Sequence, residues 1–578
     1  MSVLVVHPED SPVEGPWAQR GWDFVLDLGW AGTVAYAEWE RRLGCPVRGF
    51  YGYAKGPEDF RRIGAAVSAG RGILVDECGL DWWEMLAPLR LTDLLQLAIA
   101  KRAVREWSAG ELTATRRHPV AALLAKVSRR GIRYWQAGGG SGVRERLGRI
   151  RTAARRMTPA QLLQATLDKW DMGYRLRGRM ARRGRVGAEG AVLLPSAYAN
   201  VTRILHAYAR CVPEQEFLLV TTRRGGRMSG LAGNVRMAAL AGYADGATAA
   251  STRREARMLE RAWDVLDQGP LRESEDLAAA WENGSFQEIG TSFEGWLRIR
   301  DAWKKVIEEE RISGVLCGDE NNATNRIPVL LAAQRNLPTV HCDHGALNVL
   351  LPLRSPACDT YLVKGAMERE YLARTSSIPA SRVVEGAPGL VFAAKPGDAT
   401  AEGAEKGKIV FFSEQLELTM GRTRILYEEL LPRLCALART HNTRVVIRLH
   451  PFESRNQRRE FVDAVVPLAE RELVEMIEGP LTEELLGNTW FGLTVESSVA
   501  VDCAIRGIAC FLCQWFATPV TGYDQQYVRY GAARELASPE DVARIPEMLE
   551  GFHIAPEVQR GLWNPIAPGK LKEILRKP

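Results

Sequence analysis

The chain has 578 residues, 46% of them hydrophobic and 25% charged, with a net charge of +6. This length exceeds what one hydrophobic core supports, so two or three domains are expected, and the composition is that of a soluble globular protein. There is no run of about 18 apolar residues, and MSVLVVHPED begins as a strand rather than a signal peptide, so we expect a cytoplasmic protein. We find no zinc-finger, RNP or helix-turn-helix pattern, and nucleic acid is not an expected partner.

Residues 1 to about 100 have an α/β pattern. The apolar runs Val3–Val6, Phe24–Leu28 and Gly72–Val75 are expected strands that alternate with helical stretches. Aromatic and acidic clusters follow two of them, DLGW at 27–30 and DECGLDWW at 76–83. These tryptophans could contact a sugar ring or lipid, and core packing explains them equally well.

A helical and basic segment is expected from about 90 to 190. It contains the Gly-rich break GGGSG at Gly138–Gly142, which is typical of a loop. Between Arg144 and Arg185 arginines recur with very few acids. Such a helical surface can bind anionic lipid headgroups or an acidic acceptor, each charge near a membrane adding about 1 kcal/mol. A solvated arginine-rich face is the alternative; the first interpretation predicts peripheral association with the inner face of the cytoplasmic membrane.

A second α/β series is expected to begin at Ala191–Leu194 and to continue with a strand at Phe217–Val220. Ser196 to Asn200 lie between the first of these strands and a helix, where amides and hydroxyls can hold a substrate or cap the helix. Helical segments are expected from about 227 to 310.

The stretch from Ile312 to Gly345 reads strand, polar loop, helix, strand, polar loop, which is the pattern of a parallel βαβ unit. Ligands of such units bind beyond the carboxyl ends of the strands. Gly345 permits a tight turn or a close backbone approach. The alternative is that both loops are merely polar connections. The residues expected at one rim of the sheet are Asp319, Glu320, Asn321, Asp343 and His344.

Strands at Thr360–Val363 and Arg382–Glu385 are expected to complete this series. The sequence KPGDATAEGAEKGK near 391–407 is typical of an interdomain linker. A third series of strands is predicted after it, at Ile409–Phe412, Val445–Leu449, Val474–Ile477, Phe491–Val495 and Ile508–Leu512. We therefore predict an α/β protein of two Rossmann-like domains facing each other across a cleft, residues 1–395 with a helical basic insertion at about 90–190, and residues 396–578.

Two polar motifs follow strands of the last series. Arg448 and His450 lie two residues apart on VVIRLHP, so they share one side of the strand and can meet the same anionic ligand. Glu496, Ser497 and Ser498 end the strand FGLTV and start a helix, where hydroxyls and free amides form a phosphate site or simply cap the helix.

Other ligand motifs are weak or missing. There is no GxGxxG after the first strand and no Walker sequence, which argues against dinucleotide or ATP chemistry. Among ten cysteines, Cys510 and Cys513 form a single CxxC pair inside the apolar run IACFLCQW, which favours buried thiols over a metal site.

Three signatures in order, Asp343-His344-Gly345, His450-Pro451 and Glu496-Ser497-Ser498, resemble those of GT-B glycosyltransferases that build bacterial surface polysaccharides. The pattern is similar to that of bacterial sialyltransferases, Kdo transferases of capsule and lipopolysaccharide assembly, and teichoic acid glycerophosphotransferases. The resemblance covers about residues 310 to 515. It implies a GT-B fold with a C-terminal nucleotide-sugar-binding domain, a catalytic loop before Gly345, and donor phosphate contacts from His450, Ser497 and Ser498.

One departure from these families bears on the donor. Sialyltransferase loops usually carry two adjacent acids before the glycine, whereas His344 fills the second place here, as in the Kdo and glycerophosphate transferases. The resemblance therefore implies a CMP-activated donor of Kdo or a related acidic sugar, and a growing surface glycan or glycolipid as acceptor. Glu496 is expected near the ribose or base.

Sugar transfer needs a base, or a carboxylate nucleophile with a second acid/base group. Asp343 is our first choice for the essential group, with Glu320 and then Asp319 as alternatives, and His344 is assigned to donor phosphate or leaving-group stabilisation. No cofactor or metal is expected, because no DxD-like triplet ends a strand. The alternatives are a nucleotide-sugar epimerase of GT-B-like fold and a non-catalytic glycan-assembly protein.

Overall fold

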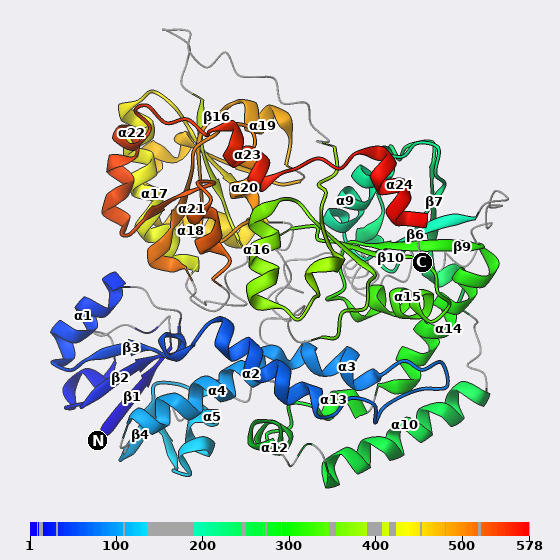
Figure 1. Ribbon diagram of the computed structural model, residues 1–578. Helices are drawn as coiled ribbons and strands as arrows, with labels where there is room; N and C mark the ends of the chain where they lie inside the picture. The colour runs from blue at the N-terminus through cyan, green and yellow to red at the C-terminus, as the bar shows by residue number, and fades with distance from the viewer. Residues whose placement is uncertain are drawn as a thin grey trace, which may run out of the picture. The chain divides into compact units, whose positions relative to one another are not determined.

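The computed structural model describes residues 1–578 except 8–9, 11–14, 30–32, 108–109, 136–189, 245–249, 270, 272–273, 291, 346–353, 390–406, 415–422, 451–452, 480, 518–521 and 577–578. The glycine-rich break, the basic region Arg144–Arg185 and almost all of the predicted linker lie outside the described residues. The described strands form three sheets in which every pairing is parallel (Figure 1). The expected α/β class with parallel, Rossmann-like sheets is thus confirmed.

The chain divides into two compact units. The first comprises Met1–Asp59, Gln96–Ala137 and Phe392–Trp563, and the second comprises Phe60–Leu95, Gly138–Val391 and Asn564–Pro578. The first unit holds two of the sheets and the second unit holds one. Within the described residues no helix is both long and apolar enough to cross a bilayer.

The first sheet has five strands in the order β3-β2-β1-β4-β5. Their bounds are β1 Ser2–Val6, β2 Phe24–Asp27, β3 Val47–Gly49, β4 Glu111–Ala114 and β5 Ile132–Tyr134. The helices α4 (Leu91–Glu106) and α5 (Pro119–Ser128) precede and follow β4. Leu4 and Val6 of β1 pack in an apolar cluster with Trp17 and Trp22, which explains part of the N-terminal aromatic content as core.

This sheet differs from the prediction in two places. The segment from 90 to 190 was expected to be helical, but β4 and β5 lie within it, so strands of residues 1–395 form two sheets rather than one. Gly72–Val75 is not a strand; Val75 makes only an isolated bridge with Asp81. Gly72 and Ile73 lie in a turn in which Gly72 has a φ of 81°, and the Asp81 carboxylate accepts the Gly72 amide, so this run is not extended.

The second sheet has seven strands in the order β12-β11-β10-β9-β6-β7-β8. Their bounds are β6 Ala191–Ser196, β7 Phe217–Thr221, β8 Val235–Ala239, β9 Ile312–Cys317, β10 Thr339–Cys342, β11 Thr360–Val363 and β12 Val383–Glu385. The strand β8 lies in a region predicted to be helical. The chain order reverses between β6 and β9, which is the switch point where open parallel sheets bind ligands.

Helices connect the strands of the second sheet. They include α9 (Ala199–Arg210), α10 (Ala250–Gln268), α14 (Phe293–Glu309), α15 (Ala323–Ala333) and α16 (Ala366–Thr375). The C-terminal helix α24 (Pro568–Arg576) connects no strands but packs against β9 and β10. The helix α15 is the crossover of the predicted βαβ unit and packs against β9. It begins at Asn322, whose side chain accepts the Thr324 amide and so caps the helix directly after the acidic loop.

The third sheet has six strands in the order β15-β14-β13-β16-β17-β18, with its switch point between β13 and β16. The strands are β13 Lys408–Phe412, β14 Val445–Arg448, β15 Val474–Ile477, β16 Thr489–Thr494, β17 Cys510–Cys513 and β18 Arg534–Leu536. The helices named below are α17 (Thr423–Thr440), α18 (Arg455–Val465), α20 (Val499–Ala504) and α21 (Asp524–Arg529). Sequence analysis missed β18, in which Leu536 is the single buried residue of three.

Candidate functional site

The polar loops after β9 and β10 lie together at the carboxyl edge of the second sheet. The ring nitrogen Nδ1 of His344, in the loop after β10, is 2.9 Å from the carbonyl oxygen of Gly318, in the loop after β9. Strands β9 and β10 are direct neighbours, with Val340 in register with Leu316. Because the strands are parallel and adjacent, the residues that follow them meet at one rim, as the sequence pattern predicts.

Asp319 is buried and serves first as a local cap. Its Oδ1 accepts the backbone amides of Asn321 at 3.0 Å and Asn322 at 3.3 Å. Burial raises the pKa of Asp319; the charge of His344 opposes this effect and the charge of Asp343 adds to it. Asp319 is thus more readily protonated than an ordinary aspartate, as a proton donor would need to be.

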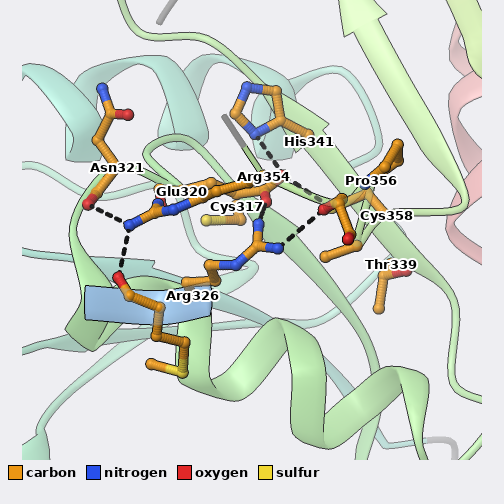
Figure 2. A network of polar contacts seen from close by, with 12 residues as sticks. Cys317, Glu320, Asn321, Arg326, Thr339, His341, Arg354, Pro356 and Cys358 are labelled. Atoms are coloured by element: carbon orange, nitrogen blue, oxygen red, sulfur yellow. Dashed lines mark hydrogen bonds and ion pairs between the residues drawn. The ribbon is translucent and has the colours of Figure 1, made fainter. Parts of the chain in front are cut away.

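Glu320 lies in a fully buried network of charged groups (Figure 2). Its carboxylate forms an ion pair with Arg326 of α15, lies 3.1 Å from Nδ1 of His341, and accepts the thiol of Cys358 at 3.2 Å. Burial alone would raise the pKa of Glu320, but the charges of Arg326 and His341 lower it to about 2.

Two arginines complete the Glu320 network. The guanidinium of Arg326 also contacts Glu84 at 3.1 Å and donates to the carbonyl oxygen of Ser355 at 2.9 Å. Arg354 donates to the Glu320 carbonyl oxygen and, at 2.9 Å, to that of Met85. The Glu320 side chain is 1% exposed and its partners occupy both oxygens, so its contacts in this structure are those of a structural residue. Its expected catalytic role stays a prediction, which the variant Glu320→Gln tests.

Asp343 is 4% exposed and lies between two histidines. Its Oδ2 is 3.7 Å from Nε2 of His341, and its Oδ1 is 3.8 Å from Nδ1 of His344. Burial alone would raise the pKa of Asp343, but the contact with His341, aided by the charges of His344 and Lys364, lowers it. Asp343 is therefore an ionised carboxylate behind the surface rather than at it.

Lys364 fixes the turn that carries Asp343 and His344. Its ammonium group donates to the Gly345 carbonyl oxygen at 2.8 Å and pairs with Glu368 of α16 at 2.8 Å. The Lys364 amide also donates to Glu368 at 2.7 Å. The turn after β10 is thus tied to the start of α16 by a buried ion pair.

His344 is the accessible member of this group, with its side chain 31% exposed. A carbonyl oxygen only accepts hydrogen bonds, so the contact with Gly318 places the proton of the neutral ring on Nδ1. Nε2 then carries the lone pair. An exposed imidazole with its tautomer fixed by a backbone carbonyl and a buried carboxylate beside it is the arrangement of a general base.

In the third sheet, the end of β14 is held by Glu453. The Glu453 carboxylate is buried and accepts the His450 amide at 2.6 Å, the Ser413 hydroxyl at 2.8 Å and Nε of Arg458 at 2.7 Å. Arg448 and His450 are both half-buried, and Leu449 between them is buried, as expected for side chains on one side of a strand. Burial, with the charge of Arg448, lowers the pKa of His450.

The amides after β16 are occupied by a carboxylate from the same sheet. Oε1 of Glu414 accepts the hydroxyl of Thr494 at 2.7 Å. It also accepts the amides of Val495, Glu496 and Ser497 at 2.9, 2.9 and 3.2 Å. Burial raises the pKa of Glu414, and these four donors oppose that effect. The expected phosphate site at Glu496, Ser497 and Ser498 therefore lacks free amides at its first two residues. The Ser497 hydroxyl accepts the Val499 amide. Ser498 is the N-cap of α20, but its side chain makes no capping hydrogen bond.

Sequence reasoning missed Glu414, His341, Arg326 and Lys364, because none of them belongs to a recognisable motif. The cysteines of the CxxC motif are both buried in β17, with thiols that are not in a disulfide. Across the described ranges, no group of three or more histidine, cysteine, aspartate or glutamate side chains is arranged to hold a metal ion.

No protein-family model and no curated protein sequence matches the chain. Among solved structures, it is similar to a complex of Staphylococcus aureus MnaA with UDP, at 13% identity and a TM-score of 0.38, over 66% of this chain and 92% of that one. It is also similar to the UDP-GlcNAc 2-epimerase of Methanocaldococcus jannaschii, at 12% identity and a TM-score of 0.41, over 67% and 99% of the two chains. The calicheamicin glycosyltransferase CalG4 gives 12% identity and a TM-score of 0.35, over 67% and 94%. Similarity at this level assigns neither a family nor an activity.

Proposed function

We propose that the chain is a nucleotide-sugar-dependent glycosyltransferase in which His344 activates the acceptor. The observation that carries this proposal is the exposed His344 ring, held on the Gly318 carbonyl oxygen and placed 3.8 Å from the ionised, buried Asp343. An imidazole in this state presents the lone pair of its Nε2 to an acceptor hydroxyl.

In the proposed reaction, Nε2 of His344 takes the proton of an acceptor hydroxyl as its oxygen bonds to the anomeric carbon of the donor. The bond between that carbon and the phosphate oxygen breaks, and the nucleotide leaves with the electron pair. Asp343 stabilises the imidazolium that forms. This exchanges the roles expected from the sequence, because Asp343 is too buried to meet a hydroxyl and His344 is accessible.

The donor end of the proposal rests on the third sheet. Arg448 is the last residue of β14 and His450 follows two residues later, at the edge where parallel sheets bind ligands, and we assign both to the donor phosphates. The hydroxyls of Ser497 and Ser498 remain proposed phosphate contacts, and Glu496 a proposed contact of the ribose or base. A CMP-linked acidic sugar such as Kdo, an acceptor that is a surface glycan or glycolipid, and metal-independent transfer are proposed from the motif resemblance.

A nucleotide-sugar epimerase is the second candidate, favoured by the pair Asp319 and Asp343. The pKa of Asp319 is raised chiefly by burial, and that of Asp343 is lowered by His341 despite its burial. Two carboxyl groups whose pKa values are shifted in opposite directions are suited to act as acid and base. An epimerase removes and returns a proton on one substrate and needs no acceptor.

Incubating the protein with CMP-, CDP- and UDP-sugars, with and without glycan acceptors, tests the proposal. A glycosyltransferase releases nucleotide at a rate that rises with acceptor. An epimerase keeps the nucleotide attached and changes the configuration of the sugar, which NMR of the product detects. If neither nucleotide release nor a new sugar configuration occurs with any donor, the proposal is wrong.

A further inference from the structure

We propose that His341, the next-to-last residue of β10, is a buried imidazolium that positions Asp343 for the chemistry of His344. The positioning role rests on the proposed function, whereas the charge state of His341 does not. His341 is 2% exposed, so it contacts no substrate and is a positioning residue rather than a catalytic one.

Two carboxylates face the two ring nitrogens of His341. Nδ1 lies 3.1 Å from a carboxylate oxygen of Glu320, and Nε2 lies 3.7 Å from a carboxylate oxygen of Asp343. Neither contact has the geometry of a directed hydrogen bond, so the attraction is one of charge. The ring also packs against Tyr361 of β11, with centroids 5.4 Å apart.

A neutral imidazole does not fit between two carboxylates. It has one N–H and one lone pair, and the lone pair would face an ionised oxygen in a buried site. Protonation at both nitrogens turns both contacts into attractions. Burial alone would lower the pKa of His341, but Asp343 and Glu320 raise it to about 10, which agrees with this geometry.

Among the described residues, the other charged groups around His341 do not connect Glu320 to Asp343. Glu320 is shared with Arg326 of α15, and Arg354 contacts the Glu320 carbonyl oxygen rather than its carboxylate. On the far side of Asp343, Lys364 is paired with Glu368 and bound to the Gly345 carbonyl oxygen. Among these groups, His341 touches both Glu320 and Asp343, and so links the buried network to the rim.

The consequence is a row of alternating charges that reaches the rim of the sheet. It runs from Arg326 through Glu320 and His341 to Asp343, and the neutral ring of His344 lies beside Asp343 at the end of the row. Each charge stabilises its neighbours, and in a buried site with few other partners such attractions are strong. By holding Asp343 ionised and in one orientation, His341 keeps the carboxylate in place for the proton that His344 takes up.

Histidine-selective ¹⁵N NMR of the full chain tests the charge state directly. We expect one histidine signal with the shifts of a doubly protonated ring that stays unchanged from pH 6 to pH 9. This signal should be absent from the spectrum of the His341→Asn variant. If that variant does not fold, the assignment is made by replacing each of the other histidines in turn, and the signal should persist in every one of those variants. A neutral His341 ring in this range overturns the proposal.

His206 provides an internal control. It lies in the same unit and is largely buried, but its Nε2 accepts the Ala232 amide at 2.9 Å, so its ring must be neutral. Burial, with the charge of Arg210, lowers its pKa. The two histidines should therefore show opposite protonation states in one spectrum.

Turnover separates this inference from the proposed function. For a positioning residue, His341→Asn should lower kcat about tenfold or more while the donor KM stays nearly unchanged. An imidazolium signal without turnover on any donor would contradict the proposed function and leave the charge state standing. Turnover with a neutral His341, or with kcat unchanged in His341→Asn, would overturn the positioning role alone.

Discussion

The replacement Glu320→Gln separates a structural role from a catalytic one at the second acidic candidate of the βαβ unit. The substitution keeps the size of the side chain but removes the charge that faces Arg326 and His341. Breaking a buried ion pair by neutralising one partner costs about 3–5 kcal/mol, because the other charge stays buried without compensation. The lowering of the Glu320 pKa from 4.5 to about 2 corresponds to about 3 kcal/mol in favour of the ionised form, in agreement.

Urea unfolding at pH 7, followed by tryptophan fluorescence, measures this loss of stability. The matched control is Glu308→Gln in the same unit, where an exposed carboxylate pairs with Arg335 at 2.9 Å and should contribute about 1 kcal/mol or less. Since the Glu320 pKa is lowered on folding, its contribution is complete above about pH 4.5 and is lost as the pH falls toward about 2. If Glu320→Gln is as stable as the parent protein but has no turnover, Glu320 is catalytic and the structural assignment is wrong.

Three further predictions concern the third sheet and the basic region. His450→Ala should weaken nucleotide binding several-fold, since a hydrogen bond to a charged group contributes about 1.5–3 kcal/mol; unchanged affinity for every nucleotide by calorimetry removes His450 from the site. Glu414→Gln keeps an acceptor oxygen and should lower the free energy of urea unfolding by less than about 1 kcal/mol. Glu414→Ala leaves the amides of residues 495–497 unpaired and should lower it by about 1–3 kcal/mol. Equal losses of stability in the two variants would refute this reasoning. Replacing four arginines between Arg144 and Arg185 by glutamine should reduce binding to anionic vesicles while activity on a soluble acceptor survives; a parent protein that binds no vesicles at low salt contradicts the membrane prediction.

The strands around the site could be predicted because their sequence signals are local. The segments that form β9 and β10 are short, largely buried runs rich in β-branched and apolar residues, each followed by polar residues. Because the strands are parallel neighbours, Asp319, Asp343 and His344 come to one edge. The short strands β4 and β5 were missed because three or four residues between helical patterns carry little periodicity. The buried residues of strands such as β13 and β17 also form apolar runs in the sequence, so these strands could be predicted.

The fate of individual acidic residues could not be predicted from the sequence, since it depends on partners far along the chain. Glu320 is structural because Arg326, Arg354 and Cys358 close around it, and none of these stands out in a helical or loop pattern. Glu414 follows β13 in an ordinary polar loop, yet it fills the amides about 80 residues later that a helix start would otherwise offer to phosphate. A local sequence pattern does not predict how deeply a carboxylate is buried, and burial determines which carboxylate a substrate can contact.

The most direct test of the central claim is the turnover of His344→Asn, with the best donor and acceptor found for the parent protein. Our account predicts a loss of kcat of at least about 100-fold, because the ring that takes the acceptor proton is gone, with nucleotide affinity and urea stability close to those of the parent protein. Asp343→Asn should lower kcat similarly, since the imidazolium of His344 would lose its counter-ion, but it should also lower the urea stability, because Asp343 is a buried charged partner of His341. Near-normal turnover in His344→Asn would contradict the account and return the role of base to a carboxylate.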